Sequence, residues 1–156
     1  MSPLTFRNAN EADAEGIASV LQELVAAGKR QSASDSEFAR AHYITHSNNL
    51  QCTVAEDEDG NILGFQALIL AIEDNPYGAP VGWGVIGTHI RPTAARRGIG
   101  RQLFERTHAA ARANNLEAID ATIGANNPEG LNYYEAMGFR DYRVSDGAIS
   151  KAFRLR

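Results

Sequence analysis

The segment that most constrains the fold is the one in which an apolar strand passes into an amphipathic helix, residues 89–104, HIRPTAARRGIGRQLF. Apolar and β-branched residues lead up to Pro92, and apolar side chains recur at helical spacing around and beyond Gly100. A second segment with the length and pattern of a strand, residues 116–124, follows this helix. A strand, a helix and another strand in this order predict a βαβ crossover with parallel strands.

The rest of the hydrophobic pattern predicts antiparallel strand pairs and three further helices. Asp59 and Gly60 lie in the turn between two apolar runs, which is the pattern of a β-hairpin. Asn10 is a suitable helix cap and Gly28 a suitable helix stop. Hairpins beside one βαβ unit predict a mixed sheet with helices on its faces. The expected strands are residues 4–9, 51–56, 62–74, 81–92, 116–124, 139–144 and 148–156, and the expected helices are residues 10–28, 37–46, 98–115 and 127–138.

The composition is that of an ordinary globular protein. With 156 residues, 44% of them hydrophobic and 22% charged, the chain predicts a single domain over residues 1–156. Its net charge of -4 gives no general reason to expect nucleic acid or an anionic membrane as a partner. Cys52 is the only cysteine, which excludes an intrachain disulfide. The first residues carry no signal-peptide pattern and the longest apolar run is short, so we expect a cytoplasmic protein.

The start of the helix after Pro92 has the features of a phosphate site. A helix that begins at Gly98 to Gly100 presents unpaired backbone N–H groups and the positive end of its dipole to an anion. Glycines leave room for a bulky anion, and Arg96, Arg97 and Arg101 add forked donors suited to phosphate oxygens. A Gly-x-Gly by itself is more often an ordinary turn, but this one follows a strand and opens an amphipathic helix. We therefore interpret the segment as a pyrophosphate site.

Two other phosphate-binding motifs fit less well. The P-loop pattern Gly-x4-Gly-Lys-Ser/Thr is absent from the sequence. The dinucleotide pattern Gly-x-Gly-x-x-Gly occurs as GWGVIG from Gly82 to Gly87, but it falls inside an expected strand, whereas the motif works only as a strand-to-helix turn. These glycines indicate instead a bulge or a splayed strand edge to which a ligand comes close.

Two segments together resemble the signatures of the GNAT superfamily of N-acetyltransferases. IRPTAARRGIGRQLF is similar to the acyl-CoA signature after the fourth strand, and NNPEGLNYYEAMGF is similar to the second signature, with an asparagine seven residues before a tyrosine. The resemblance implies an α+β fold with a mixed, mostly antiparallel sheet of about seven strands, helices on both faces, and a splay between strands four and five. It implies acetyl-CoA as co-substrate. Ala95 departs from the pattern, because the family usually has Gln or Arg there.

The resemblance also assigns residues to the coenzyme. The backbone of Ile90 corresponds to the one that pairs with the pantetheine arm, and Tyr134 to the tyrosine near the coenzyme sulfur, where its hydroxyl is suited to protonate the thiolate. His89 lies on the opposite strand face, where a structural role is more common, and Tyr133 is expected to be a packed helix residue. The coenzyme-binding residues implied are Thr88, His89, Ile90, Arg96, Arg97, Gly98, Ile99, Gly100, Arg101, Asn127 and Tyr134.

The general base is not fixed by the resemblance. Gly84 and Thr122 stand at the two positions where relatives carry a glutamate. Glu73, Asp120 and His42 are the remaining candidates: Glu73 at the end of the third strand, Asp120 on the face of Thr122, and His42 on the second helix. His42 and His46 are four residues apart, but no third ligand is evident, so we predict no metal.

The sequence therefore predicts an N-acetyltransferase that transfers an acetyl group from acetyl-CoA to a primary amine of a small molecule or peptide, by direct attack in a ternary complex. The alternative from another class is a non-catalytic acyl-CoA sensor, which the missing glutamates favour and Tyr134 opposes. A nicotinamide-dependent oxidoreductase is a third and weaker interpretation. The acceptor is open, and a homodimer is common among the proteins that the chain resembles.

Overall fold

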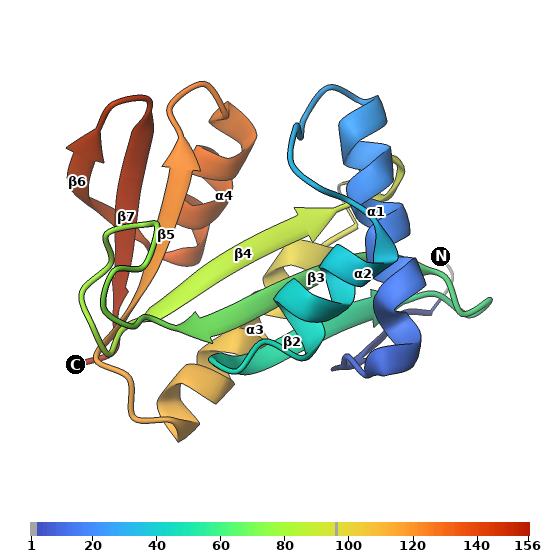
Figure 1. Cartoon of the computed structure of the whole chain (residues 1–156), viewed down its shortest axis with the longest axis horizontal. Coiled ribbons are helices and arrows are strands. Elements are labelled where there is room, and N and C mark those ends of the chain that lie inside the picture. The colour runs from blue at the N-terminus through green and yellow to red at the C-terminus, as the bar shows by residue number, and fades with distance from the viewer. Residues whose placement is uncertain (1–2, 96) are drawn as a thin grey trace.

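A sheet of seven strands, in the order β1-β2-β3-β4-β5-β7-β6, is the frame of the computed structural model, which describes residues 3–95 and 97–156 (Figure 1). Neighbouring strands are antiparallel except β4 and β5, which are parallel and are joined through α3. The mixed sheet and the single βαβ unit confirm the predicted fold class. The strands are β1 Thr5–Asn8, β2 Asn49–Glu56, β3 Ile62–Leu70, β4 Gly84–Ile90, β5 Ala118–Gly124, β6 Arg140–Ser145 and β7 Ala148–Arg154.

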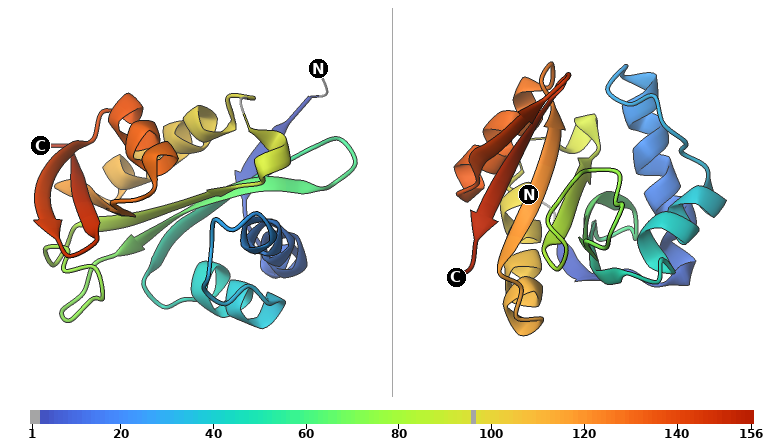
Figure 2. Two further views of the ribbon diagram at one scale, coloured as in Figure 1. Left: turned by 90° about the horizontal axis from the view of Figure 1, so that it is seen from above. Right: turned by 60° about the vertical axis from the view of Figure 1, so that its left-hand side comes forward.

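Helices cover both faces of the sheet. The longer helices are α1 Ala14–Ala26, α3 Ile99–Ala113 and α4 Pro128–Met137, and α2 is the single turn Ser36–Ala39. Figure 2 shows α1 and α2 on one face and α3 and α4 on the other. Beneath α1, Ile17 and Leu21 pack on Phe65, and beneath α3 and α4, Phe104 packs on Phe139. Two apolar layers therefore enclose the sheet, as an amphipathic pattern on four helices requires.

Two helices start differently from the expectation. Asn10 accepts a bond from Ala12 and pairs with Asp13 in a capping box, but it caps a 3-10 turn, Glu11–Asp13, and α1 follows. The second helix was expected over residues 37–46. It is α2 followed by a π-helical turn, Arg40–Ile44, because the Arg40 carbonyl accepts the N–H of Thr45, five residues on. The stop at Gly28, with a φ of 75°, is confirmed.

The parallel strands β4 and β5 separate soon after they meet. Their pairing consists of Gly84 with Ile119 and Val85 with Asp120, and the remaining residues of β4 lie next to β3 alone (Figure 1). This divergence confirms the predicted splay between strands four and five. The pattern GWGVIG begins in the turn before β4, at Gly82 and Trp83, and only its last four residues lie in the strand. It leads into a strand and not into a helix.

The strands β4 and β5 meet at Gly84, where the absence of a side chain leaves room for two leucines. A Cβ at Gly84 would lie 2.7 Å from Leu68 Cδ1 and 2.9 Å from Leu116 Cδ1. Both leucines belong to the core beneath α3 and α4, so this position faces apolar side chains.

Among the described helices, none is long and apolar enough to cross a membrane.

We expect Gly84→Ala to lower the free energy of unfolding by about 1–3 kcal/mol, because the added methyl overpacks the junction of β4 and β5. Gly87→Ala is the matched control on the same strand, since its Cβ would meet nothing nearer than His89 Cε1 at 3.7 Å. Urea unfolding of both variants measures the difference. Equal losses in the two variants would contradict the importance of the tight junction.

Candidate functional site

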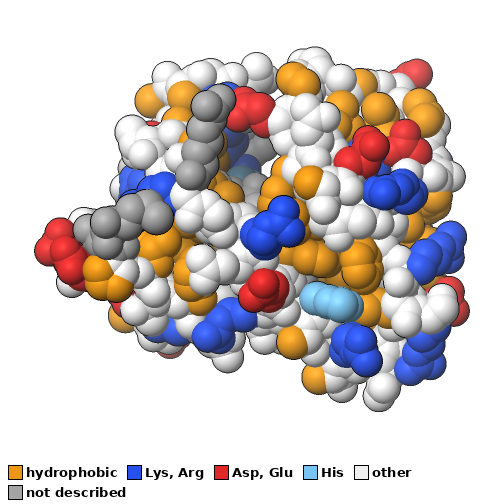
Figure 3. All heavy atoms as spheres, turned by 180° about the vertical axis from the view of Figure 1, so that it is seen from behind, with side chains coloured by type: hydrophobic (Ala, Val, Ile, Leu, Met, Phe, Trp, Pro, Cys, Tyr) orange, Lys and Arg blue, Asp and Glu red, His pale blue; other side chains and the backbone are white. Residues whose placement is uncertain are grey.

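A groove of about 1200 Å³ follows the gap between β4 and β5. Its walls come from β4, the start of α3, the end of β5, α4, and the segment after α1. Seen from behind, the surface is hollowed near its upper edge, with basic and histidine side chains inside the hollow (Figure 3). Among the residues predicted for the site, those that line the groove are Thr88, His89, Ile90, Gly98, Ile99, Gly100, Arg101, Asn127 and Tyr134.

The edge of β4 offers unpaired backbone groups to this groove. The N–H of Arg91 donates to the Leu63 carbonyl (2.9 Å), which fixes the odd-numbered residues of β4 as those that bond to β3. Successive residues of a strand direct their backbone groups to opposite sides. The N–H and C=O groups of Thr88 and Ile90 therefore face the gap, beyond the residues of β4 that pair with β5. An extended ligand is able to bond to them as an added strand does.

Tyr134 is held at the middle of the gap. Its hydroxyl lies 2.8 Å from Thr88 Oγ1, and its ring packs on Phe139 in the core beneath α4. Burial raises the pKa of Tyr134 above its ordinary value, and the hydrogen bond with Thr88 offsets this in part. The phenol therefore stays protonated at neutral pH and is suited to give a proton to an anion formed beside Thr88.

Tyr133 has a larger role than the packed side chain that the sequence predicts. Its hydroxyl donates to the Gly100 carbonyl (2.6 Å) and accepts from Gln66 Nε2 (2.9 Å), and Gln66 also donates to Thr88 Oγ1 (2.9 Å). Burial raises the pKa of Tyr133 to about 12. Sequence reasoning missed Gln66. Its signal was one polar residue in the apolar run GFQALIL of β3, and it is fully buried.

The two glycines before α3 serve different purposes. Gly98 has a φ of 74°, in the left-handed region, and nothing lies within 4 Å of where its Cβ would be, so the approach to the helix start is open. A Cβ at Gly100 would lie 2.6 Å from Tyr133 Cε1. Packing of the tyrosine ring, and not only room for an anion, thus explains Gly100.

The basic residues of this segment are placed unevenly. Arg101 lines the groove, whereas Arg97 is half-buried outside it. Arg96 lies outside the described residues, so its predicted contact stays a prediction. The preceding turn is fixed to α1, because Glu23 accepts from the N–H and the hydroxyl of Thr93 at 3.1 and 3.0 Å.

Asn127 caps α4, with Oδ1 accepting from the Gly130 N–H (3.1 Å).

Asp120 is one of the three candidate bases, and it is fully buried. It accepts from Thr122 Oγ1 (2.9 Å) and from the Tyr142 hydroxyl, and Thr122 is bonded in turn to Ser150 Oγ (2.9 Å). Burial raises the pKa of Asp120, although both hydrogen bonds lower it. Asp120 does not line the groove, but Thr122 does. A proton taken from the groove is therefore able to reach Asp120 through the Thr122 hydroxyl.

The other two candidate bases lie away from the groove. Glu73 is exposed in the loop after β3. His42 lies in the π-helical turn, stacked on Phe38 with ring centroids 5.0 Å apart. Among the residues that the structure describes, no three His, Cys, Asp or Glu side chains are grouped to hold a metal.

His89 and Arg30 form a pair that the sequence did not indicate. His89 stacks on Phe65, with ring centroids 4.9 Å apart, and Arg30 Nη1 lies 3.4 Å from His89 Nε2. Burial, with the charge of Arg30 second and that of His42 third, lowers the pKa of His89 to about 3. The imidazole is therefore neutral at neutral pH. Its contacts are consistent with the structural role expected for its side chain.

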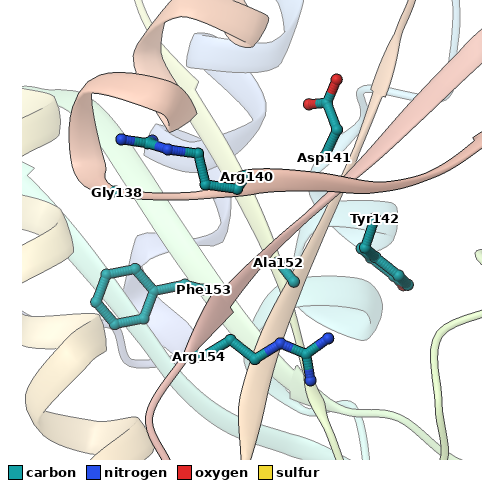
Figure 4. A pocket seen from close by; sticks show the side chains of 7 residues that line it. All are labelled: Gly138, Arg140, Asp141, Tyr142, Ala152, Phe153 and Arg154. Atoms are coloured by element: carbon teal, nitrogen blue, oxygen red, sulfur yellow. The ribbon is translucent and has the colours of Figure 1, made fainter.

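A smaller hollow of about 260 Å³ lies at the far end of the sheet, on β6 and β7. Figure 4 shows its lining side chains, which include Arg140 and Arg154. None of the residues predicted for the site lines it.

Comparison with known proteins identifies the family of this chain. The model of the Acetyltransferase (GNAT) family matches residues 18–139. The chain belongs to this family. This membership supports an acetyl-CoA-dependent acyltransferase and leaves no basis for the nicotinamide interpretation. No curated protein sequence matches the chain.

Solved structures share the fold over almost the whole chain. A GCN5-related N-acetyltransferase from Kribbella flavida has a TM-score of 0.77 at 24% identity, covering 97% of this chain and 98% of that one. The yncA protein from Salmonella typhimurium, solved with its cofactor acetyl-CoA, has a TM-score of 0.73 at 18% identity, covering 98% and 94%. The paia N-acetyltransferase from Thermoplasma acidophilum, in complex with coenzyme A, has a TM-score of 0.75 at 14% identity, covering 98% and 99%. At these identities the likeness shows the fold.

We expect His89→Gln to make this GNAT protein less sensitive to mild acid. The folded chain resists protonation of His89 down to a pKa of about 3, whereas the unfolded chain takes up that proton near 6.5. Stability is therefore lost as the pH falls below 6.5, by up to about 1.4 kcal/mol per pH unit. Urea unfolding between pH 6.5 and about pH 4.5 compares the slopes. The same slope in wild type and variant would contradict a neutral, buried His89.

Proposed function

We propose that this chain transfers an acetyl group from acetyl-CoA to a primary amine of a small molecule or peptide by direct attack in a ternary complex. The single observation that carries the proposal is the contact of Tyr134 with Thr88, which places a protonated phenol beside the unpaired edge of β4. That pairing of a proton donor with an open strand edge suits thioester chemistry, and it favours catalysis over the sensor alternative.

The groove fits the coenzyme in three parts. The open approach to α3 at Gly98 suits a diphosphate, since N–H groups of the first helical turn point toward it. The unpaired groups of Thr88 and Ile90 suit the amides of a pantetheine arm. Ile86, Ile123 and Met137 line the groove with apolar surface. When bound, acetyl-CoA supplies the acetyl group as a thioester with a thiolate leaving group.

The proton donor, Tyr134, and the proton acceptor, Thr122 with Asp120, lie on opposite faces of the sheet. Ile123 and Tyr134 belong to the core beneath α3 and α4, whereas Thr122, the neighbour of Ile123 on β5, points to the other face. An amine that approaches from the face of Thr122 attacks the carbonyl carbon, the C–S bond breaks, and Tyr134 gives its proton to the sulfur. The proton of the amine passes to Thr122 Oγ1 as the hydroxyl proton passes to Asp120.

We expect Tyr134→Phe to lower kcat at least about 100-fold while acetyl-CoA binding is kept, because the leaving thiolate loses its proton donor. Thiol release over a panel of amines measures kcat, and calorimetry measures binding. Tyr133→Phe is the comparison variant, since it removes the adjacent hydroxyl, which donates to Gly100 and accepts from Gln66, and leaves the phenol of Tyr134 in place. Tight acetyl-CoA binding by wild type without turnover of any amine would instead support the sensor.

Loss of the proton acceptor should appear in the pH profile. We expect Asp120→Asn and Thr122→Val each to lower kcat/KM about 100-fold or more and to remove its acidic limb, which reflects a carboxylate whose pKa is raised by burial. Glu73→Gln and His42→Gln are controls that should keep the wild-type rate and profile. A loss in either control, with Asp120→Asn fully active, would assign the base elsewhere.

A further inference from the structure

Arg30 extends from the loop between α1 and α2 into the wall of the groove. Contacts on several sides hold its guanidinium in place. Nη2 donates to the Ala33 carbonyl (2.9 Å), Nη1 lies 3.4 Å from His89 Nε2, and the group lies over the Phe38 ring, 5.7 Å from its centroid. The side chain is therefore pre-arranged before any ligand binds.

The positive charge of Arg30 has no counter-ion in the part of the chain that the structure describes. No Asp or Glu oxygen of residues 3–95 and 97–156 lies within 4.0 Å of it, although Arg7 and Arg91 both have carboxylate partners. Its Nε is buried with no hydrogen-bond partner, and so is His89 Nδ1. A guanidinium cannot lose its proton, so a half-buried one without a carboxylate partner is suited to an oxyanion.

The location of this charge points to the acceptor. His89 packs on Phe65 and Tyr43, which places Arg30 on the face of the sheet that carries Thr122 and not on that of Tyr134. Between His89 and the strand junction, Gly87 has no side chain, and its Cβ would meet only the His89 ring. The face by which the amine reaches Thr122 is thus open and bordered by Arg30.

We infer that the acceptor is an amine that also carries a carboxylate or a similar oxyanion, and that Arg30 binds this acidic group. The inference rests on the proposed acetyl transfer and names the substrate class of that same site. Neutral His89 limits the movement of the guanidinium without repelling it. The forked donors of Arg30 match a carboxylate better than a lysine would.

The test compares amino acids with their carboxamides as acceptors, in thiol-release assays of wild type, Arg30→Gln, Arg30→Lys and Lys29→Gln. The ratio of kcat/KM for acid over carboxamide, compared between proteins, cancels the different basicity of the two amines. We expect this ratio to fall about 10- to 100-fold in Arg30→Gln, since a hydrogen bond to a charged group is lost, and less in Arg30→Lys. The KM for acetyl-CoA should be unchanged. Lys29→Gln removes a charge from the same loop and should keep the ratio.

Calorimetry with coenzyme A present gives a second readout that does not need turnover. Binding of the acidic amines to wild type, lost in Arg30→Gln, supports the inference even if no amine is acetylated, in which case the proposed function alone fails. An unchanged acid-to-carboxamide ratio in Arg30→Gln overturns the inference and leaves acetyl transfer standing. A raised KM for acetyl-CoA with an unchanged ratio also overturns it and assigns Arg30 to a coenzyme phosphate. The absence of binding by any acidic amine tested overturns it as well.

Discussion

The separation of β4 from β5 after two paired residues is the constraint on which the rest of the structure depends. A parallel pair that continued would satisfy every backbone group of β4 and leave no opening between the strands. Because the pair stops at Val85, the groups of Thr88 and Ile90 have no partner strand on this side and are open to water or a ligand. The groove, the helix start and Tyr134 all lie around this opening.

A buried polar cluster holds the two sides of the opening in register. Gln66 on β3 bonds to Thr88 on β4 and to Tyr133 on α4, and Tyr133 bonds to the carbonyl of Gly100 on α3. Four elements therefore meet through three hydrogen bonds in a site where unpaired polar groups are costly. This cluster links the start of α3 to Thr88 on β4, so the two cannot shift independently.

The strand pleat places the residues of the proposed mechanism on two faces of the sheet. Alternation along β5 puts Ile123 in the core beneath α3 and α4, with Tyr134. It puts Thr122, with Asp120 behind it, on the face of His89 and Arg30. In the proposed reaction, a thioester lying in the gap is attacked from one face and protonated from the other. The same geometry explains why the proton donor and the charge that we assign to the acceptor do not interfere with each other.

Local patterns in the sequence determined the order and type of the elements, the hairpin turn at Gly60 and the helix start at Gly98, because periodicity and backbone freedom are properties of short segments. They also marked Tyr134 through two spaced signatures. The roles of Tyr133, Gln66 and Arg30 were decided by the tertiary structure, since the contacts Tyr133–Gly100, Gln66–Tyr133 and Arg30–His89 join residues 33, 67 and 59 positions apart along the chain. The fold also decided that Asp120, and not Glu73, is buried behind the groove. The raised pKa of Asp120 follows from this burial, because the pKa of a side chain depends on the neighbours that folding brings to it.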